Sequence, residues 1–253
     1  MRTHLTRSLV VAGASLVLAI LVVRAPAVAQ IPDKFTNLKV LPKDISKDEL
    51  VSTMRGFASG LGVRCTHCHV GGSAADLTGM KFESDDKKEK KIARAMMKMV
   101  REINGPLLKK TGIENPIQVK CVTCHHGVMR PESLADILKR DFEKGGADSA
   151  KADYLALKTK YYGAAAYDFK PRTLNEVAEW LSNERKDDDA AIAIMQFNIE
   201  QDPAVAYSYN LLGRIQAGKG DKQAAIASLK KAIELDPNDK QSARILEKLQ
   251  AEK

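Results

Sequence analysis

The sequence CTHCH at residues 65–69, followed by CVTCH at residues 121–125, decides the chemistry of this chain and with it the fold. Each pentad reads Cys-x-x-Cys-His, in which two thiols can add to the vinyl groups of one haem and the imidazole can ligate its iron. The two pentads use every cysteine in the sequence. We therefore predict two haem c groups. The attachment residues are Cys65, Cys68, Cys121 and Cys124, and the iron-ligating histidines are His69 and His125.

Two alternatives to haem attachment could also use the four cysteines. Four thiolates can hold one structural zinc ion, and the cysteines of an exported protein can form disulfides or a redox dithiol. Neither alternative uses the histidine that ends each pentad. Haem attachment accounts for all residues of the pattern and is the favoured interpretation.

The first 29 residues have the features of a secretory signal peptide. Arg2 and Arg7 precede an apolar run over residues 9–23, and Ala27-Val28-Ala29 is a small-x-small cleavage site. Covalent attachment of haem to such pentads takes place outside the bacterial inner membrane, so export and the pentads support each other. We expect a periplasmic protein whose mature chain begins near Gln30. An uncleaved membrane anchor is the alternative.

The charge of the chain is moderately basic. It contains 40 Lys and Arg against 32 Asp and Glu, a formal net charge of +8, and the predicted signal peptide carries three of these positive charges. The propionates of two haems would offset much of the remainder. Export argues against nucleic acid as a partner. The densest basic cluster lies at the start of a helix and is interpreted as a solvated face; it consists of Lys87, Lys88, Lys90 and Lys91.

The hydrophobic pattern before each pentad is helical. Ser46 to Glu49 is a capping box that predicts a helix ending at Gly62, directly before the first pentad. A second helix is expected to begin at 84–86 and to end at 104–106, before the second pentad. One stripe of this helix is apolar and contains Ile92, Met96, Met99 and Ile103. We therefore predict an all-α fold with two units of helix, connection and haem pentad.

Each iron also needs a ligand opposite its histidine. The only other histidines of the mature chain, His67 and His126, lie in or beside the pentads, where a short tether holds them on the proximal side. Methionine is therefore favoured. The spacing points to Met54 for the first haem and leaves Met96, Met97 and Met99 for the second, although methionines also serve as flexible core residues.

These two units resemble the cytochrome c subunit of photosynthetic reaction centres, a four-haem electron carrier built from paired two-haem halves. The first matching segment runs from Met54 through LGVR at 61–64 into the first pentad. The second comprises RAMMKMVREIN at 94–104, the second pentad with His126 and Gly127, and Pro131. The resemblance implies that Met54 and Met96 are the distal iron ligands and that Met99 is a packing residue.

The chain departs from this family in two respects. It has two pentads where the family has four, and the spacer from Met96 to Cys121 is a few residues longer than usual. The resemblance therefore implies a carrier of single electrons between redox partner proteins, with association with a membrane complex as a further option. It does not imply photosynthesis.

The last third of the chain carries a different pattern. Tetratricopeptide positions are occupied by Tyr209, Leu212, Gly213, Ala225, Leu229, Ala232 and Pro237. A weaker copy precedes them, and the helix at 240–249 resembles a terminal cap. We expect this short solenoid to lean on a helical connector that packs on the haem domain. Its concave face would hold a peptide or partner protein, or the repeats would only cap the fold.

The predicted organisation has four parts: a signal peptide (1–29), a dihaem cytochrome c domain (30–131), a helical connector (132–172), and tetratricopeptide-like repeats with a capping helix (173–253). We expect an electron-transfer protein and not an enzyme. One alternative is a dihaem peroxidase-like enzyme, although only His67 and His126 are spare imidazoles for acid–base chemistry. Another is a haem-bearing scaffold or sensor in which the repeats dominate.

Overall fold

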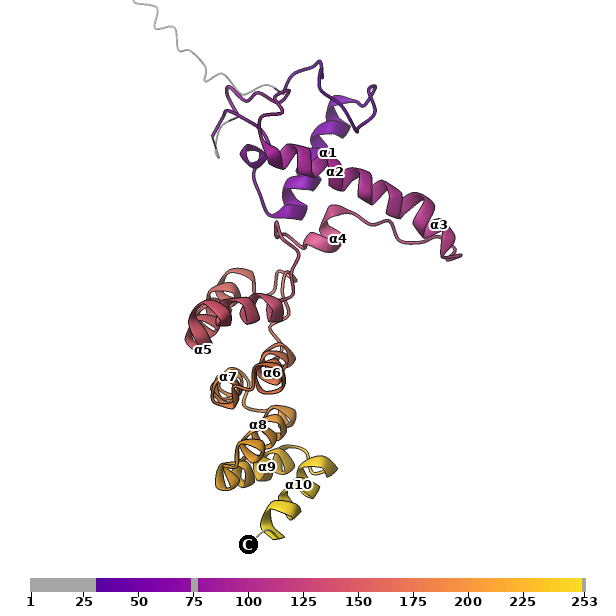
Figure 1. Cartoon of the computed structure of the whole chain (residues 1–253). Coiled ribbons are helices and arrows are strands. Elements are labelled where there is room, and N and C mark those ends of the chain that lie inside the picture. Colours follow the sequence, from indigo (N-terminus) through magenta and orange to yellow (C-terminus); the bar gives the residue numbers. More distant parts are fainter. Residues whose placement is uncertain (1–30, 74–76, 252–253) are drawn as a thin grey trace, which may run out of the picture.

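The computed structural model describes residues 31–73 and 77–251, and all the regular elements in this part of the chain are helices (Figure 1). An isolated antiparallel bridge between Val70 and Lys81 is the one β contact there. The all-α prediction is confirmed. The predicted signal peptide and its cleavage site lie outside the described residues. Of the helices that are described, none combines the length and the apolar character needed to cross a bilayer.

The first part of the chain contains both pentads. Its elements are α1 (Lys47–Leu61), η1 (Cys65–His67), α2 (Lys88–Glu102), the π-helical turn η2 (Ile103–Leu107), α3 (Leu108–Lys110) and α4 (Cys121–His125). The capping box at the start of α1 is present, because the Ser46 hydroxyl accepts a hydrogen bond from the Glu49 amide and the Glu49 carboxylate accepts one from the Ser46 amide. The helix ends at Gly62 with a φ of 64°, which favours glycine.

The second helix differs from its prediction at both ends. It begins at Lys88, because Ser84 bonds to Asp86 in a preceding turn and the Asp85 carboxylate faces three cations. It does not stop at Asn104-Gly105-Pro106. The chain continues through η2 into α3, because the π-helical turn accommodates Pro106 without breaking the helical path.

Glycines bring the two pentads together. α1 packs against α4, and the Gly127 amide donates a 3.0 Å hydrogen bond to the Gly60 carbonyl. A Cβ at Gly62 would lie 2.0 Å from the Gly127 carbonyl oxygen, and one at Gly60 would lie 3.0 Å from the Val122 amide nitrogen. The end of the helix that leads into the first pentad therefore touches the second pentad directly.

The second part of the chain is a stack of helices that extends away from the pentads (Figure 1). Its elements are α5 (Leu134–Tyr161), α6 (Pro171–Trp180), η3 (Leu181–Arg185), α7 (Asp188–Gln201), α8 (Ala206–Lys219), α9 (Lys222–Leu235) and α10 (Lys240–Ala251). α5 is interrupted at Gly145 and Gly146, which have non-helical backbone angles.

The connector packs on the repeats, as expected, but the core it shares with them contains no residue of the haem domain, on which the sequence also led us to expect it to pack. Leu138 and Tyr154 of α5 lie in one buried cluster with Val177, Ile194 and Leu211 of the following helices. The Tyr154 ring meets Phe197 edge-on at 5.5 Å between centroids. The reason is that the apolar side chains of α5 face α6 and α7, so the connector and the first repeat share a core.

The α8–α9 hairpin has the close contact expected of a tetratricopeptide repeat. A Cβ at Gly213 would lie 2.8 Å from the Leu229 Cγ, and Ala225, Leu229 and Ala232 are fully buried. Two residues predicted to pack the hairpin, Gly213 and Leu229, are therefore in contact. This small-to-large fit lets the two helices of the hairpin approach closely.

Candidate functional site

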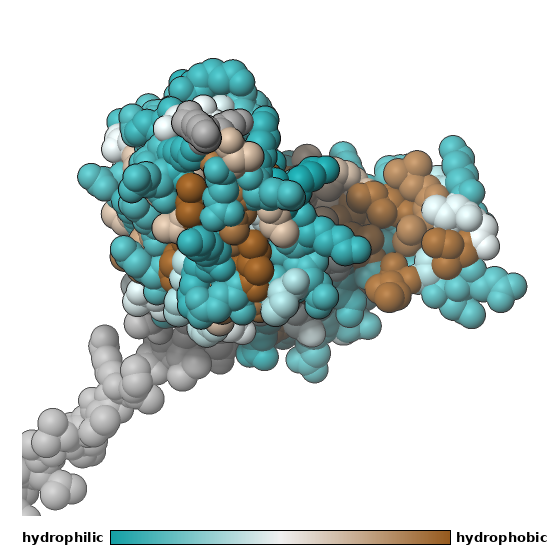
Figure 2. All heavy atoms as spheres, turned by 90° about the horizontal axis from the view of Figure 1, so that it is seen from below, coloured by the Kyte–Doolittle hydropathy of each residue, from teal (hydrophilic) through white to brown (hydrophobic). Residues whose placement is uncertain are grey.

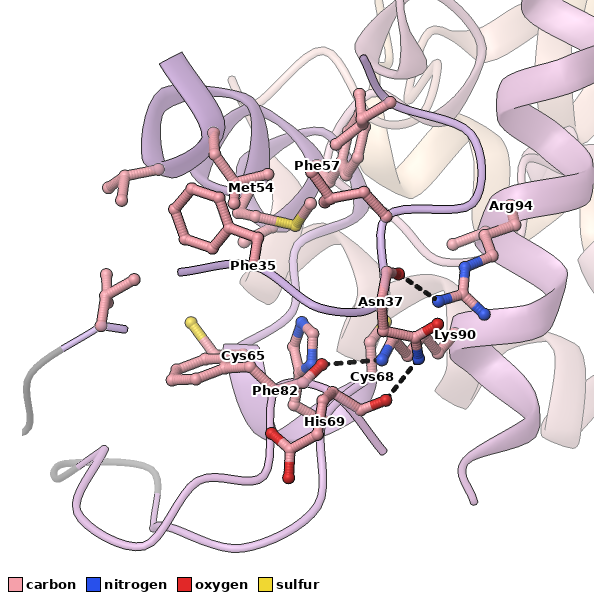
Figure 3. A pocket seen from close by; sticks show the side chains of 18 of the residues that line it. Phe35, Asn37, Met54, Phe57, Cys65, Cys68, His69, Phe82, Lys90 and Arg94 are labelled. Atoms are coloured by element: carbon pink, nitrogen blue, oxygen red, sulfur yellow. Dashed lines mark hydrogen bonds between the residues drawn. The ribbon is translucent and has the colours of Figure 1, made fainter. Parts of the chain in front are cut away.

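The first pentad and α1 enclose a cavity of about 310 Å³ in which four predicted site residues meet (Figure 3). These residues are Met54, Cys65, Cys68 and His69. The Met54 side chain comes from α1 and the His69 ring from the segment after η1, so the two enter the cavity from different elements (Figure 3). The left-handed turn at Gly62 makes this possible, since it reverses the chain between α1 and the pentad.

The remaining wall of this cavity is mainly apolar. It is built from α1, from the 31–41 segment, from the 77–83 loop and from one face of α2. Representative side chains are Phe35, Phe57, Leu61, Phe82 and Met97. A cavity with apolar walls and a few convergent sulfur and nitrogen atoms suits a large flat organic group such as a haem macrocycle.

His69 has the state that an iron ligand needs. Burial, followed by the positive charge of Lys90, lowers the pKa of its imidazole, so the ring is neutral and keeps a lone pair for a metal. Its Nδ1 is buried and has no hydrogen-bond partner in the described part of the chain. The Phe82 ring packs edge-on at 5.1 Å between centroids. A half-buried, neutral imidazole beside two thiols, with no hydrogen bond at Nδ1 within the described chain that fixes the orientation of its ring, fits a haem site.

A buried lysine holds the loop that closes this cavity. The Lys90 ammonium donates to the Phe82 carbonyl at 2.7 Å and to the Ser84 carbonyl at 2.6 Å, and thus keeps Phe82 over His69. Lys90 is buried, so its interpretation as part of a solvated face was wrong. The reason is that this side chain points from α2 toward the cavity and meets two backbone carbonyls there.

Asp85 joins the segments around the cavity. Its carboxylate accepts hydrogen bonds from Lys39 at 2.6 Å, Arg94 at 2.7 Å and Asn37 at 2.9 Å. The Lys39 hydrogen bond is the main cause that holds the pKa of this carboxyl well below its usual range. Asp85 therefore stays charged and connects the 37–39 segment, the loop before α2, and α2 itself.

The histidine of the second pentad has its ring oriented by a hydrogen bond. His125 is buried, and its Nδ1 lies 2.9 Å from the Val128 carbonyl oxygen. Because a carbonyl can only accept, Nδ1 must carry the hydrogen and donate it. The lone pair is then on Nε2, and a fixed Nδ1–H bond of this kind is the usual support of a metal-bound imidazole. His125 therefore fits an iron ligand on hydrogen-bond grounds.

Two methionines that the sequence offers as ligands of the second iron are exposed. Met96 and Met99 lie on the same face of α2 with 37% and 45% of their surface accessible. Figure 2 shows apolar side chains gathered along the projecting arm at the right of the view. A bound macrocycle would cover such a stripe. Met96 lies outside the cavity that holds Met54, and its role as second distal ligand stays a prediction.

α2 presents one face to the first cavity and another to solvent. Ala93, Arg94 and Met97 line the first cavity, whereas Met96 and Met99 are exposed on another face. Successive residues of an α-helix differ by about 100°, so neighbouring Met96 and Met97 point to different sides of α2, and Met97 is the one that lines the first cavity. The sequence alone grouped Met97 with the second haem. The sequence could have shown this, because Met97 follows Arg94 and Ala93 by three and four residues and therefore shares a helix face with them.

Asn104 is a site residue that the sequence interpretation missed. Its side-chain amide donates to the Val119 carbonyl at 2.9 Å, and its carbonyl accepts from the Val119 amide at 2.8 Å. This pair of bonds ties η2, directly after α2, to the chain just before Cys121. In the sequence, Asn104 stands before Gly-Pro and resembles a helix stop, which hides its long-range contact.

The four cysteines lie in two separate pairs. Within 31–73 and 77–251, no group of three or more His, Cys, Asp or Glu side chains is placed to hold a metal ion by itself. Burial raises the pKa of the Cys68 and Cys121 thiols. Redox-active and zinc-binding cysteines need lowered values. These pairs therefore suit thioether formation better than a shared zinc site or a dithiol.

Comparison with known proteins gives two matches along the chain. Residues 15–186 match the family described as the photosynthetic reaction centre cytochrome C subunit, and residues 206–239 match the tetratricopeptide repeat. The predicted resemblance and the repeat assignment are both confirmed. No curated protein is significantly similar in sequence.

Two solved structures are similar to part of the chain. One is the first TPR of Spaghetti (RPAP3) bound to HSP90 peptide SRMEEVD, with 19% identity, a TM-score of 0.32, and coverage of 47% of this chain and 88% of that chain. The other is the NMR structure of the first TPR domain of the human RPAP3 protein, with 19% identity, a TM-score of 0.33, and coverage of 47% and 87%.

Proposed function

This chain belongs to the photosynthetic reaction centre cytochrome c subunit family, and from this premise we propose that it is an exported dihaem cytochrome c that carries single electrons between redox proteins. The observation that carries the proposal is the meeting of Met54, Cys65, Cys68 and His69 in one cavity. A bound haem would supply an iron that changes between ferric and ferrous states, without bond formation in a substrate.

The chain's own residues attach and orient this group. Each pentad supplies two thiols, whose sulfur adds to one vinyl carbon while the thiol hydrogen goes to the other. The histidines offer a neutral ring nitrogen to the iron. A methionine sulfur as the further iron ligand would favour the ferrous state relative to a second histidine, and the apolar wall around His69 would exclude water and raise the potential of a bound haem further.

Export and docking complete the proposal. Periplasmic localisation is supported by the basic, apolar and small-x-small segments of residues 1–29 and by the place where haem is attached to such pentads. The repeat match at 206–239 supports docking of a protein or peptide on the α6–α10 stack, because stacked helical hairpins form extended concave surfaces. Association with a membrane complex is a further part of this proposal.

The intact mass tests the proposal directly. After periplasmic expression with haem-maturation machinery, the full chain should gain the mass of two haems and lose the segment before Gln30. The variant Cys121→Ala/Cys124→Ala should gain one haem only, since the first cavity is complete without these residues. No gain in the unmodified chain, or one haem only, would contradict the dihaem assignment.

The exposed second site gives the peroxidase-like alternative a specific test. An enzyme of that kind needs a five-coordinate iron that small ligands can reach. If the second iron is closed by methionine, carbon monoxide should leave the ferrous absorption spectrum unchanged. A spectrum in which about half of the haem binds carbon monoxide would favour an enzyme or a gas sensor over a simple carrier.

A further inference from the structure

The basic charge of the chain is concentrated in the arm formed by α2 to α4. Residues 87–126 contain ten Lys and Arg against three Asp and Glu, a net charge of +7. Residues 132–253 have a net charge of −2. The two propionates of a haem at the second pentad would still leave this arm strongly positive. An electrostatic field of this size attracts acidic molecules over several ångströms.

The arm also exposes apolar side chains beyond the methionine face of α2. Ile113 and Ile117, in the segment between α3 and α4, are 62% and 90% exposed, and Met129 after the second pentad is 57% exposed. Figure 2 shows apolar side chains gathered along this arm. Contiguous exposed apolar surface with a polar rim is typical of an interaction site.

Three lysines flank these apolar residues in the sequence and make no ion pair in the part of the chain that the structure describes. Lys109 and Lys110 precede Ile113, and Lys120 lies between Ile117 and the pentad. Across the described residues, none of the three forms an ion pair with a carboxylate. Lys39 and Lys90 of the first site, in contrast, both pair with Asp85. The charges of Lys109, Lys110 and Lys120 are therefore available to a partner.

The two sites differ in how closely a partner can approach. The first cavity is covered by the 31–41 segment and by the 77–83 loop. At the second pentad, Cys124 and Met96 are exposed. Electron transfer between proteins requires close approach of the two cofactors. The exposed second pentad is therefore the better place for electrons to enter and leave the protein.

We propose that the α2–α4 arm is the docking surface for an acidic redox protein, which exchanges electrons through the second haem site. The inference rests on the proposed function. Carboxylates of the partner would face Lys109, Lys110 and Lys120, and its apolar centre would lie on Ile113 and Ile117. Complementary charge accelerates association, and the apolar contact fixes the orientation of the two proteins in the complex.

A labelled peptide tests this surface on the two-haem protein. An oligoglutamate peptide with a terminal fluorescein stands in for the acidic partner, and haem quenches the dye only at short range. We expect saturable quenching that weakens as salt is added. The variant Lys109→Glu/Lys110→Glu should raise the apparent Kd by about tenfold or more.

The control is a variant with the same change of charge in the repeats. Lys230→Glu/Lys240→Glu alters two exposed residues and should leave the Kd within about twofold. Equal losses in both variants, or no loss in either, would overturn the proposal, as would binding to phosphatidylglycerol vesicles without binding to the peptide. The haem content is measured first by intact mass, so failure of the docking surface is distinguishable from failure of the dihaem assignment.

Discussion

At the scale of single residues, the two pentad histidines differ in the hydrogen bonding of Nδ1. The Nδ1 of His125 bonds to the Val128 carbonyl, whereas that of His69 is buried without a partner in the described structure. A hydrogen bond to Nδ1 makes the imidazole a stronger electron donor to its metal. On this ground we expect the second haem to have the lower reduction potential, before differences in solvent exposure are added.

The distal ligands can be assigned by three substitutions on α1 and α2. Met54→Ala and Met96→Ala should each remove about half of the sulfur-to-iron absorption band at the red end of the visible spectrum, because each removes one of two iron-bound thioethers. Met99→Ala is the control and should keep the band. Loss of the band in Met99→Ala with its retention in Met96→Ala would show that the assigned register is wrong.

The Asn104 clamp makes a separate prediction about the second site. Asn104→Ala removes both hydrogen bonds to Val119 and should lower the free energy of unfolding by about 1–2 kcal/mol. It should also shift the reduction potential of the second haem and leave the first unchanged. Gln118→Ala, at an exposed neighbouring position, is the control. Equal shifts at both haems would contradict a local positioning role.

At the scale of secondary-structure elements, α2 presents two faces with different surroundings. One face carries Lys90, Arg94 and Met97 toward the first cavity, and another exposes Met96 and Met99. If Met96 ligates the second iron, as predicted, a movement of this helix changes both sites together. This gives a physical route by which the oxidation state of one haem can affect the other.

The contact between α1 and α4 is tested by two glycines of the same helix region. Gly62→Ala should destabilise the haem region by more than about 2 kcal/mol, because φ is 64° there and the new Cβ would collide with the Gly127 carbonyl. Gly56→Ala meets no atom within 4 Å and should be neutral or stabilise α1 by up to about 1 kcal/mol. Thermal unfolding of the two variants measures the difference. Similar melting temperatures would refute the close approach.

At the scale of the whole molecule, the natural division lies between α4 and α5. The buried cluster that begins at Leu134 runs through α5 into α8, and the haem region contributes no residue to it. A chain cut after Pro131 should therefore keep both haems and stay soluble. A chain cut after Phe169 should expose Leu138 and Tyr154, which have lost their partners on α6 and α7, and should aggregate.

Haem content by intact mass and association state by light scattering measure both truncations. The reduction potentials of the shorter chain should lie within about 30 mV of those of the full chain, a difference below about 1 kcal/mol for one electron. Loss of haem from the chain cut after Pro131 would show that the repeats are needed to complete the haem sites.

The sequence by itself determined those features that depend on short stretches of chain. The pentads, the capping box at Ser46, the glycine stop at Gly62 and the repeat positions around Gly213 follow from local chemistry, so their spacing is visible in the linear sequence. The structure places the first set of predicted ligands together, because a single helix and a single turn connect Met54 to His69.

Only the tertiary structure decided which faces of the helices meet. Lys90 is buried and not solvated, Met97 turns to the first cavity, Asn104 reaches Val119, and α5 packs on the repeats. Each of these outcomes depends on a partner far away in the sequence. Amphipathic patterns show that a helix has a face to bury, but the identity of the surface that buries it is set by how the whole chain packs.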